Sequence, residues 1–126
     1  MTNVSLGQNS NMTVPPSERE RIQKFYLDVL GCPLTKTSGA ADVFRMGTDF
    51  YIGFVYNDSA LDEPTLLKSI WLELRTARPD ELKKKILEFG IKEIEFWDKD
   101  HFYFQAPGGQ VFRLVGDTED MSKWQR

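Results

Sequence analysis

Apolar residues recur at helical spacing in two stretches of the chain. The first stretch begins with SERE, residues 17–20, which matches a capping box: the Ser17 hydroxyl would cap free amides and Glu20 would reach back. Behind it, one apolar stripe comprises Ile22, Phe25, Tyr26, Val29 and Leu30. Gly31 follows directly, as glycine often does at the left-handed end of a helix. This stretch predicts an amphipathic helix that ends at Gly31.

The second stretch repeats this design about 60 residues later. Pro79 stands at a first-turn position and is followed by the acidic Asp80 and Glu81. Apolar residues then occupy positions 82, 86, 87 and 89, and Gly90 takes the place that Gly31 has in the first stretch. We expect a second helix here.

Short β-prone runs surround both helices in the same order. One run precedes each helix and three follow it. In the first half the runs are residues 12–14, 34–37, 42–46 and 50–56, and in the second half 69–75, 92–97, 101–105 and 110–115. Turn sequences at 46–49 and 106–109 separate the last two runs of each half. The chain therefore reads as one β-α-β-β-β unit written twice.

This repeat predicts an α+β fold in which two βαβββ modules pair, with curved sheets inside and the helices on their outer faces. The polar segment NDSALDEPTLLK is expected to link the modules. The expected organisation is a flexible N-terminus at 1–10, one domain at 11–115 (module one 11–56, linker 57–68, module two 69–115), and a C-terminal tail at 116–126.

Composition narrows the range of partners. The chain has 126 residues, a formal net charge of −3 and a single cysteine, Cys32, so an internal disulfide is excluded. No basic surface is indicated, so nucleic acid is not an expected partner. The N-terminus lacks the pattern of a signal peptide, and no apolar run approaches the length of a membrane span. We expect a soluble, cytoplasmic protein that does not bind membranes.

Two stretches resemble a known superfamily. ERIQKFYLDVLGCPL, residues 20–34, is similar to the helix-one signature of the vicinal oxygen chelate proteins. FQAPGGQVFRLV, residues 104–115, is similar to their closing hairpin, of which only Pro107 and Gly109 are retained. The superfamily includes glyoxalase I, extradiol dioxygenases, fosfomycin-resistance enzymes and the metal-free bleomycin-resistance proteins. The resemblance implies two βαβββ modules whose mixed sheets form a U-shaped cavity.

The resemblance also assigns the positions that hold metal in the metal-dependent members. Those ligands are His, Glu or Gln on the first and last strands of each module. The corresponding residues of this chain are Asn11, Gly53, Ser69 and Arg113. Divalent metals favour imidazole or carboxylate ligands, and a fixed cation would repel them. We therefore expect neither a metal nor another cofactor.

Arg113 is the most informative of these positions, because strand alternation places it between Val111 and Val115 on one face. A buried guanidinium needs a partner. Two interpretations remain open: Arg113 anchors an anionic ligand, or it pairs with Glu73 on the neighbouring strand. The same inward parity is expected for Tyr51 and Trp71, which would suit a flat organic molecule.

These observations favour a metal-free, bleomycin-resistance-like protein that sequesters or senses a small organic molecule, with an anion as one candidate. The expected ligand-binding residues are Arg113, Glu73, Trp71, Tyr51, Ser69 and Asn11. One alternative is a diverged enzyme of the superfamily, a lyase, isomerase or dioxygenase-like protein, that uses Glu73 or His101 as an acid or base. Another is a scaffold without a ligand. A homodimer is expected, since two-fold pairs are the commonest oligomers.

Overall fold

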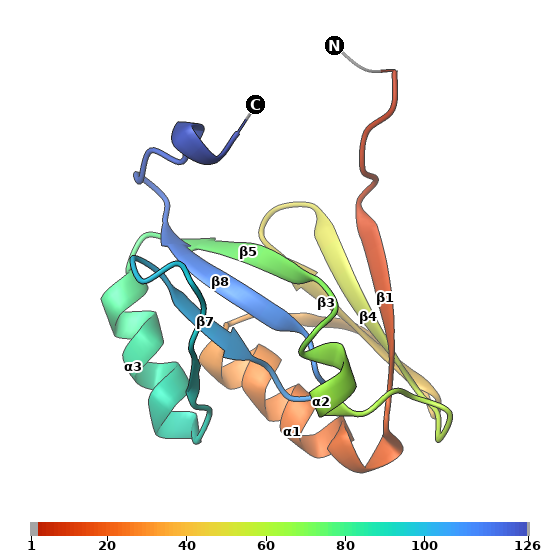
Figure 1. Cartoon of the computed structure of the whole chain (residues 1–126). Helices are drawn as coiled ribbons and strands as arrows, with labels where there is room; N and C mark the ends of the chain where they lie inside the picture. The colour runs from red at the N-terminus through yellow and green to blue at the C-terminus, as the bar shows by residue number, and fades with distance from the viewer. Residues whose placement is uncertain (1–2, 126) are drawn as a thin grey trace. The chain divides into compact units, whose positions relative to one another are not determined.

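The structure is a computed structural model that describes residues 3–125 (Figure 1). The chain divides into two compact units, Met1–Asp62 and Glu63–Arg126. Each unit contains one four-stranded mixed sheet and one principal helix, in the order β-α-β-β-β. The predicted fold class, α+β with two βαβββ modules, is confirmed.

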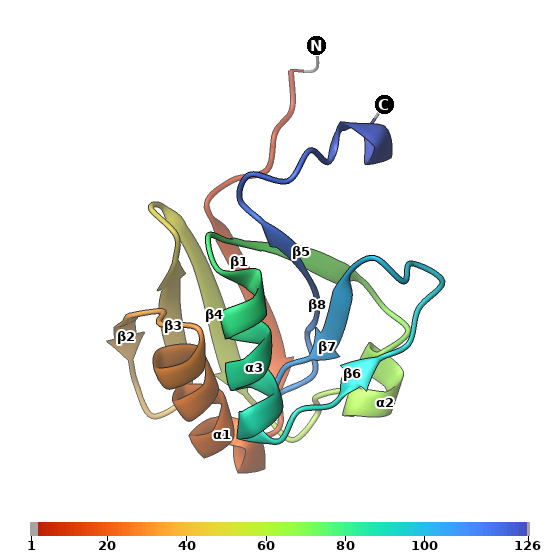
Figure 2. The same ribbon diagram turned by 90° about the vertical axis from the view of Figure 1, so that its left-hand side faces the viewer.

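Module one consists of β1 (Asn9–Val14), η1 (Pro16–Glu18), α1 (Arg19–Lys24), η2 (Phe25–Val29), β2 (Leu34–Thr37), β3 (Ala41–Met46) and β4 (Phe50–Tyr56). The sheet order is β1-β4-β3-β2, and β1 runs parallel to β4 (Figure 2). The helical segment packs on one face of this sheet, where the Tyr26 ring lies 5.5 Å from Phe44 and 5.0 Å from Phe54. The opposite face includes Asn11 and Gly53, which are register partners.

The first helix starts differently from the prediction. Ser17 makes no side-chain cap; instead, Pro15 and Pro16 lead into the 3₁₀ turn η1. Proline fixes φ and has no amide to cap, so a capping serine has less to satisfy. Glu20 accepts a hydrogen bond from Lys24 rather than reaching back. The last turn, η2, is of π type, and it ends as predicted at Gly31, whose φ is +72°.

Module two consists of α2 (Glu63–Leu66), β5 (Trp71–Thr76), α3 (Pro79–Phe89), β6 (Glu93–Ile94), β7 (Phe102–Gln105), β8 (Val111–Gly116) and η3 (Ser122–Trp124). The sheet order β5-β8-β7-β6 repeats that of module one, and β5 runs parallel to β8. On one face, Lys83 of α3 lies over the Phe102 ring, and the Phe104 ring lies 5.6 Å from the Phe112 ring. Arg113 alternates with these residues and therefore belongs to the opposite face.

Several strand boundaries differ from the sequence prediction. β1 begins at Asn9, inside the segment 1–10, and the backbone oxygen of Gln8 already accepts the Tyr51 amide. β5 begins at Trp71, so Ser69 lies before the strand. The predicted run 92–97 pairs only at Glu93–Ile94. Residues 1–2 and 126, which belong to the predicted flexible terminus and tail, lie outside the described residues.

The predicted linker contains the short helix α2. Glu63 binds the β7–β8 turn through two contacts: its backbone oxygen accepts from Gln105, and its carboxylate accepts from the Gly108 amide. The second half of the linker therefore packs as part of module two. Within residues 3–125, the structure contains no helix with the length and apolarity that a membrane crossing requires.

Candidate functional site

The centre of the Arg113 face is an ion pair between neighbouring strands. Arg113 of β8 and Glu73 of β5 are register partners, so their side chains leave the sheet on the same side. Nε and Nη2 of Arg113 donate to Oε2 of Glu73 at 3.1 and 2.5 Å. Arg113 is 4% exposed, whereas the Glu73 side chain keeps 31% of its surface exposed. The pairing that the sequence left open is thus present.

The remaining donor side of the guanidinium faces β7 and the loop before it. Nη1 of Arg113 donates to the Tyr103 hydroxyl at 3.4 Å and lies 3.5 Å from Oδ2 of Asp98. Tyr103 in turn donates to Asp98 at 2.9 Å. Burial lowers the pKa of Arg113, but its hydrogen bonds to Glu73 and Tyr103 outweigh burial and leave the pKa raised. Burial raises the pKa of Asp98, but its hydrogen bonds to His101 and Tyr103 outweigh burial and leave that pKa lowered. Arg113 therefore holds its charge between two carboxylates.

Aromatic rings enclose the guanidinium. The Trp71 ring centre lies 4.3 Å from Cζ of Arg113, and the Trp124 ring centre lies 5.3 Å from it. The ring of Phe96 lies 4.5 Å from that of Tyr103. The planar guanidinium of Arg113 is thus a site where flat aromatic rings stack.

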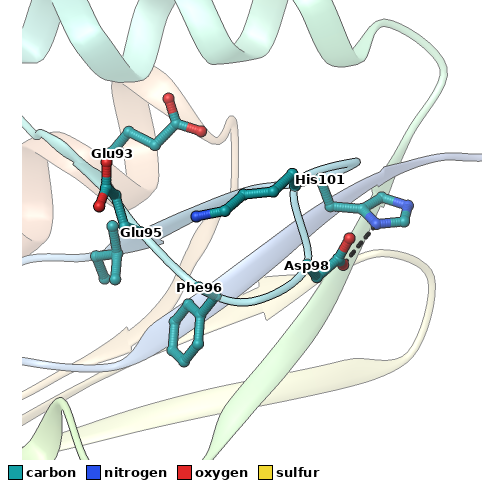
Figure 3. Close-up of a pocket in the computed structure, with 7 residues that line it drawn as sticks. Glu93, Glu95, Phe96, Asp98 and His101 are labelled. Atoms are coloured by element: carbon teal, nitrogen blue, oxygen red, sulfur yellow. Dashed lines mark hydrogen bonds and ion pairs between the residues drawn. The ribbon is translucent and has the colours of Figure 1, made fainter.

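A pocket of about 260 Å³ opens beside this network. It is lined by Glu93, Ile94, Glu95, Phe96, Asp98, Lys99 and His101. Figure 3 shows Glu93 and Glu95 on one side of the pocket and Asp98 with His101 on the other. Asp98 belongs to both the pocket and the Arg113 network. The volume is near the ~300 Å³ at which small-molecule sites begin.

His101 is held between two carboxylates. Its Nδ1 lies 2.8 Å from Asp98 and its Nε2 lies 2.6 Å from Glu119, and its side chain is 4% exposed. Burial lowers the pKa of His101, but the hydrogen bonds to Glu119 and Asp98 outweigh burial and leave the pKa raised. Both ring nitrogens are occupied, so His101 suits a charged link between segments better than a general base.

The register corrects the assignment of one metal-ligand position. In module one, Asn11 and Gly53 are partners on the first and last strands. The equivalent pair in module two is Glu73 with Arg113, so Glu73 and not Ser69 takes the first-strand position. The first-strand position therefore does hold a carboxylate, that of Glu73, but the Arg113 guanidinium neutralises it. Among residues 3–125, no group of three or more His, Cys, Asp or Glu residues is arranged to hold a metal ion.

The residues that the sequence suggested are divided between the two modules. Arg113, Glu73 and Trp71 form one cluster in module two. Asn11 and Tyr51 lie in the sheet of module one, on β1 and β4. Sequence reasoning missed four members of the network: Asp98, Tyr103, Glu119 and Trp124. For Tyr103 a signal existed, because strand alternation gives it the parity of His101 and places it opposite Arg113 across the hairpin.

Sequence comparison identifies no relatives: no protein-family profile and no curated protein matches the chain. Solved structures do match. A possible glyoxalase from Bacillus cereus aligns over 88% of this chain and 99% of its own, with 19% identity and a TM-score of 0.69. The fosfomycin resistance protein FosX from Listeria monocytogenes, in complex with Mn(II) and a dihydroxypropylphosphonic acid, aligns over 97% and 99%, with 13% identity and a TM-score of 0.74.

A third similar structure is TnmS3, an antibiotic binding protein from a Streptomyces species. It aligns over 92% of this chain and 98% of its own, with 19% identity and a TM-score of 0.65. At such low sequence identity, the structural similarity shows the fold alone, and it covers nearly the whole chain.

Proposed function

Since the chain has the fold of the vicinal oxygen chelate superfamily, we propose that it is a metal-free protein that binds, and thereby sequesters or senses, a small organic molecule. The ligand site is the Arg113 face of module two with the adjoining pocket. The chain acts as a soluble homodimer in the cytoplasm.

One observation carries this proposal: the first-strand and last-strand positions of module two hold an ion pair stacked on Trp71. Metal-dependent members of the superfamily are expected to place ligands at these positions. Here Oε2 of Glu73 accepts hydrogen bonds from Nε and Nη2 of Arg113. A divalent cation would have to bind beside a fixed positive charge, which is unfavourable. An organic ligand meets no such barrier.

The contacts of Arg113 favour a flat molecule over a simple anion. Glu73 occupies Nε and Nη2 of the guanidinium, and Tyr103 and Asp98 both lie at Nη1. An anion would compete with these carboxylates for the same donors, whereas a planar ring can stack on the guanidinium in the place that the Trp124 ring takes in this structure. The proposed ligand is therefore an aromatic or conjugated molecule, and an acidic group on it would have to share Arg113 with Glu73.

The contact of Asp98 with His101 supports a second candidate, a metal-free lyase or isomerase. A carboxylate that orients an imidazole is a common arrangement in acid-base catalysis. Here Glu119 covers the other ring nitrogen at 2.6 Å. Catalysis by His101 would therefore require Glu119 to move away, and binding alone requires no such step.

Isothermal titration calorimetry of the chelator-treated chain with Mn(II) tests the metal-free part of the proposal. We expect no saturable binding of one ion per chain. Stoichiometric binding at micromolar Mn(II) would overturn it. Glu73→Ala serves as the comparison, because this change removes the carboxylate that neutralises Arg113. This variant should likewise show no saturable Mn(II) binding.

A further inference from the structure

The segment that follows β8 lies over the site just described. Residues 117–125, which we call the strap, begin where the Asp117 amide donates to Thr76 at 2.8 Å. Met121 is buried, at 9% exposure. Beyond it, η3 carries Trp124, whose ring contacts Arg113 and also lies 5.6 Å from Trp97. Trp124 thus occupies a place where a planar ligand could stack on the guanidinium.

The docking of Trp124 has no side-chain hydrogen bond of its own. Its Nε1 is buried and has no partner among the described residues. A buried donor without an acceptor disfavours the closed position. The strap therefore depends on other contacts, of which the strongest polar one is between Glu119 and Nε2 of His101 at 2.6 Å.

We propose that the strap closes over Arg113 and is held shut by the contact of His101 with Glu119, so that loss of the proton from His101 opens it. Opening of the strap would uncover the ligand site, so the proposal adds control by pH to that site. Only the ligand site itself rests on the proposed function. The closing and opening themselves are properties of module two.

The chemistry of the imidazole explains the direction of the switch. Protonated His101 donates from Nδ1 to Asp98 and from Nε2 to Glu119. Neutral His101 retains one proton. The Asp98 side chain is 1% exposed and that of Glu119 is 40% exposed, so water can replace His101 at Glu119 only, and the proton stays at Nδ1. Nε2 then presents a lone pair to the Glu119 carboxylate, which repels it. The contacts with Glu119 and Asp98 raise the pKa of His101 despite its burial. The strap is therefore closed at acidic pH and opens as the pH rises through this raised pKa.

Other charged groups surround His101 and act on the same equilibrium. Two pockets that His101 lines also involve Asp80 and Lys83 of α3, Glu93 and Glu95 near β6, and Lys99 and Asp100 of the preceding loop. Arg113 lies beyond Asp98 at 3.5 Å. None of these groups lies on the strap, whereas Glu119, which lines one of the two pockets, does, so its removal tests the mechanism.

Amide hydrogen exchange of the full chain without ligand provides the test. The Asp117 and Glu119 amides donate to Thr76 and Gly116, which lie outside the strap, and therefore report its opening. The amides of β7 and β8 report global unfolding. Between pH 5.5 and 8.5 we expect strap protection factors to fall roughly ten- to hundredfold, as loss of a hydrogen bond to a charged group implies. Protection in β7 and β8 should change less.

Two variants and a control sharpen this result. Glu119→Gln should lower strap protection at pH 5.5 to the level of the unsubstituted chain at pH 8.5, and His101→Gln should remove the pH dependence. Asp117→Asn makes the same charge change two residues away and should behave like the unsubstituted chain. The proposal is overturned if the strap protection factors of the unsubstituted chain do not change with pH. It is also overturned if Glu119→Gln leaves the protection factors at pH 5.5 unchanged. Because no ligand is present, failure of the ligand-binding proposal would not affect these readings.

Discussion

At the scale of single residues, the contacts of Arg113 make its removal costly. Arg113→Ala would leave Asp98 buried with one partner fewer and Glu73 without its ion pair. We expect a loss of about 2 to 4 kcal/mol in the free energy of unfolding, somewhat below that of a fully buried pair because Glu73 is partly exposed. Urea unfolding of the variant measures this.

The double variant Arg113→Met with Glu73→Leu should recover most of that loss, since no stranded Glu73 charge remains. The matched control is Arg78→Met with Glu81→Leu, which removes an exposed ion pair at the start of α3. The control should change the free energy of unfolding by less than about 1 kcal/mol. A double variant that is no more stable than Arg113→Ala would show that Arg113 and Glu73 are not energetically coupled.

Asp42 governs stability at acidic pH. Its side chain is fully buried on β3 and accepts hydrogen bonds from four side chains: Arg19, Gln23, Thr37 and Tyr56. Burial raises the pKa of Asp42, but these bonds outweigh burial and lower the pKa below its ordinary value. The charged form therefore stabilises the fold above the unfolded-state pKa of ~3.9.

We expect the free energy of unfolding to decline as the pH falls below about 4, through the lowered pKa of Asp42. Asp42→Asn should lose about 2 kcal/mol at neutral pH and show a flatter decline in acid, because a carboxyl group with a lowered pKa is then missing while Asp98 and Asp120 still contribute to the slope. Urea midpoints between pH 2 and 7 measure both effects. An unchanged acid slope in Asp42→Asn would contradict this role.

At the scale of elements, the β7–β8 turn depends on Gly109. Its φ is +120°, and a Cβ there would lie 2.5 Å from Cδ1 of Leu66 in α2. Gly109→Ala should therefore destabilise the fold by about 1 to 3 kcal/mol, through the backbone and the clash. Gly39→Ala is the control, because its Cβ would meet no atom within 4 Å. Thermal unfolding compares the two, and equal effects would refute the packing of α2 on this turn.

Local signals explain which elements the sequence could predict. Gly31 and Gly90 mark both helix ends because left-handed backbone is a local requirement, and both have positive φ. Gly47, in the hairpin turn between β3 and β4, also has a positive φ and meets the same local requirement. The helix α2 has four residues and no apolar period, so nothing in its sequence distinguishes it from a loop. The run 92–97 has the composition of a longer strand, yet β6 pairs with β7 at two residues, Glu93 and Ile94.

The candidate site was predictable only in part, for a similar reason. Strand alternation placed Glu73 beside Arg113, and the parallel register bears this out. The assignment of Ser69 failed because module two has fewer residues between its first strand and the end of its helix than module one has. Asp98 and Glu119 come from irregular segments, whose approach to His101 no periodicity encodes.

At the scale of the whole molecule, the repeated module leads to a prediction about assembly. A homodimer should sediment at twice the chain mass of 14.6 kDa at micromolar concentration. Sedimentation equilibrium measures this mass directly. A single species at the mass of one chain would contradict the prediction and would leave the ligand site of module two unaffected.

The central claim is that this fold binds a small organic molecule without a metal. A native mass spectrum of the purified chain, recorded before and after dialysis against a chelator, tests it most directly. We predict the same organic adduct, one per chain, in both spectra, and its loss in the Arg113→Met, Glu73→Leu double variant but not in the Arg78→Met, Glu81→Leu control. An adduct that the chelator removes, or a divalent metal ion as the only bound species, would contradict the account.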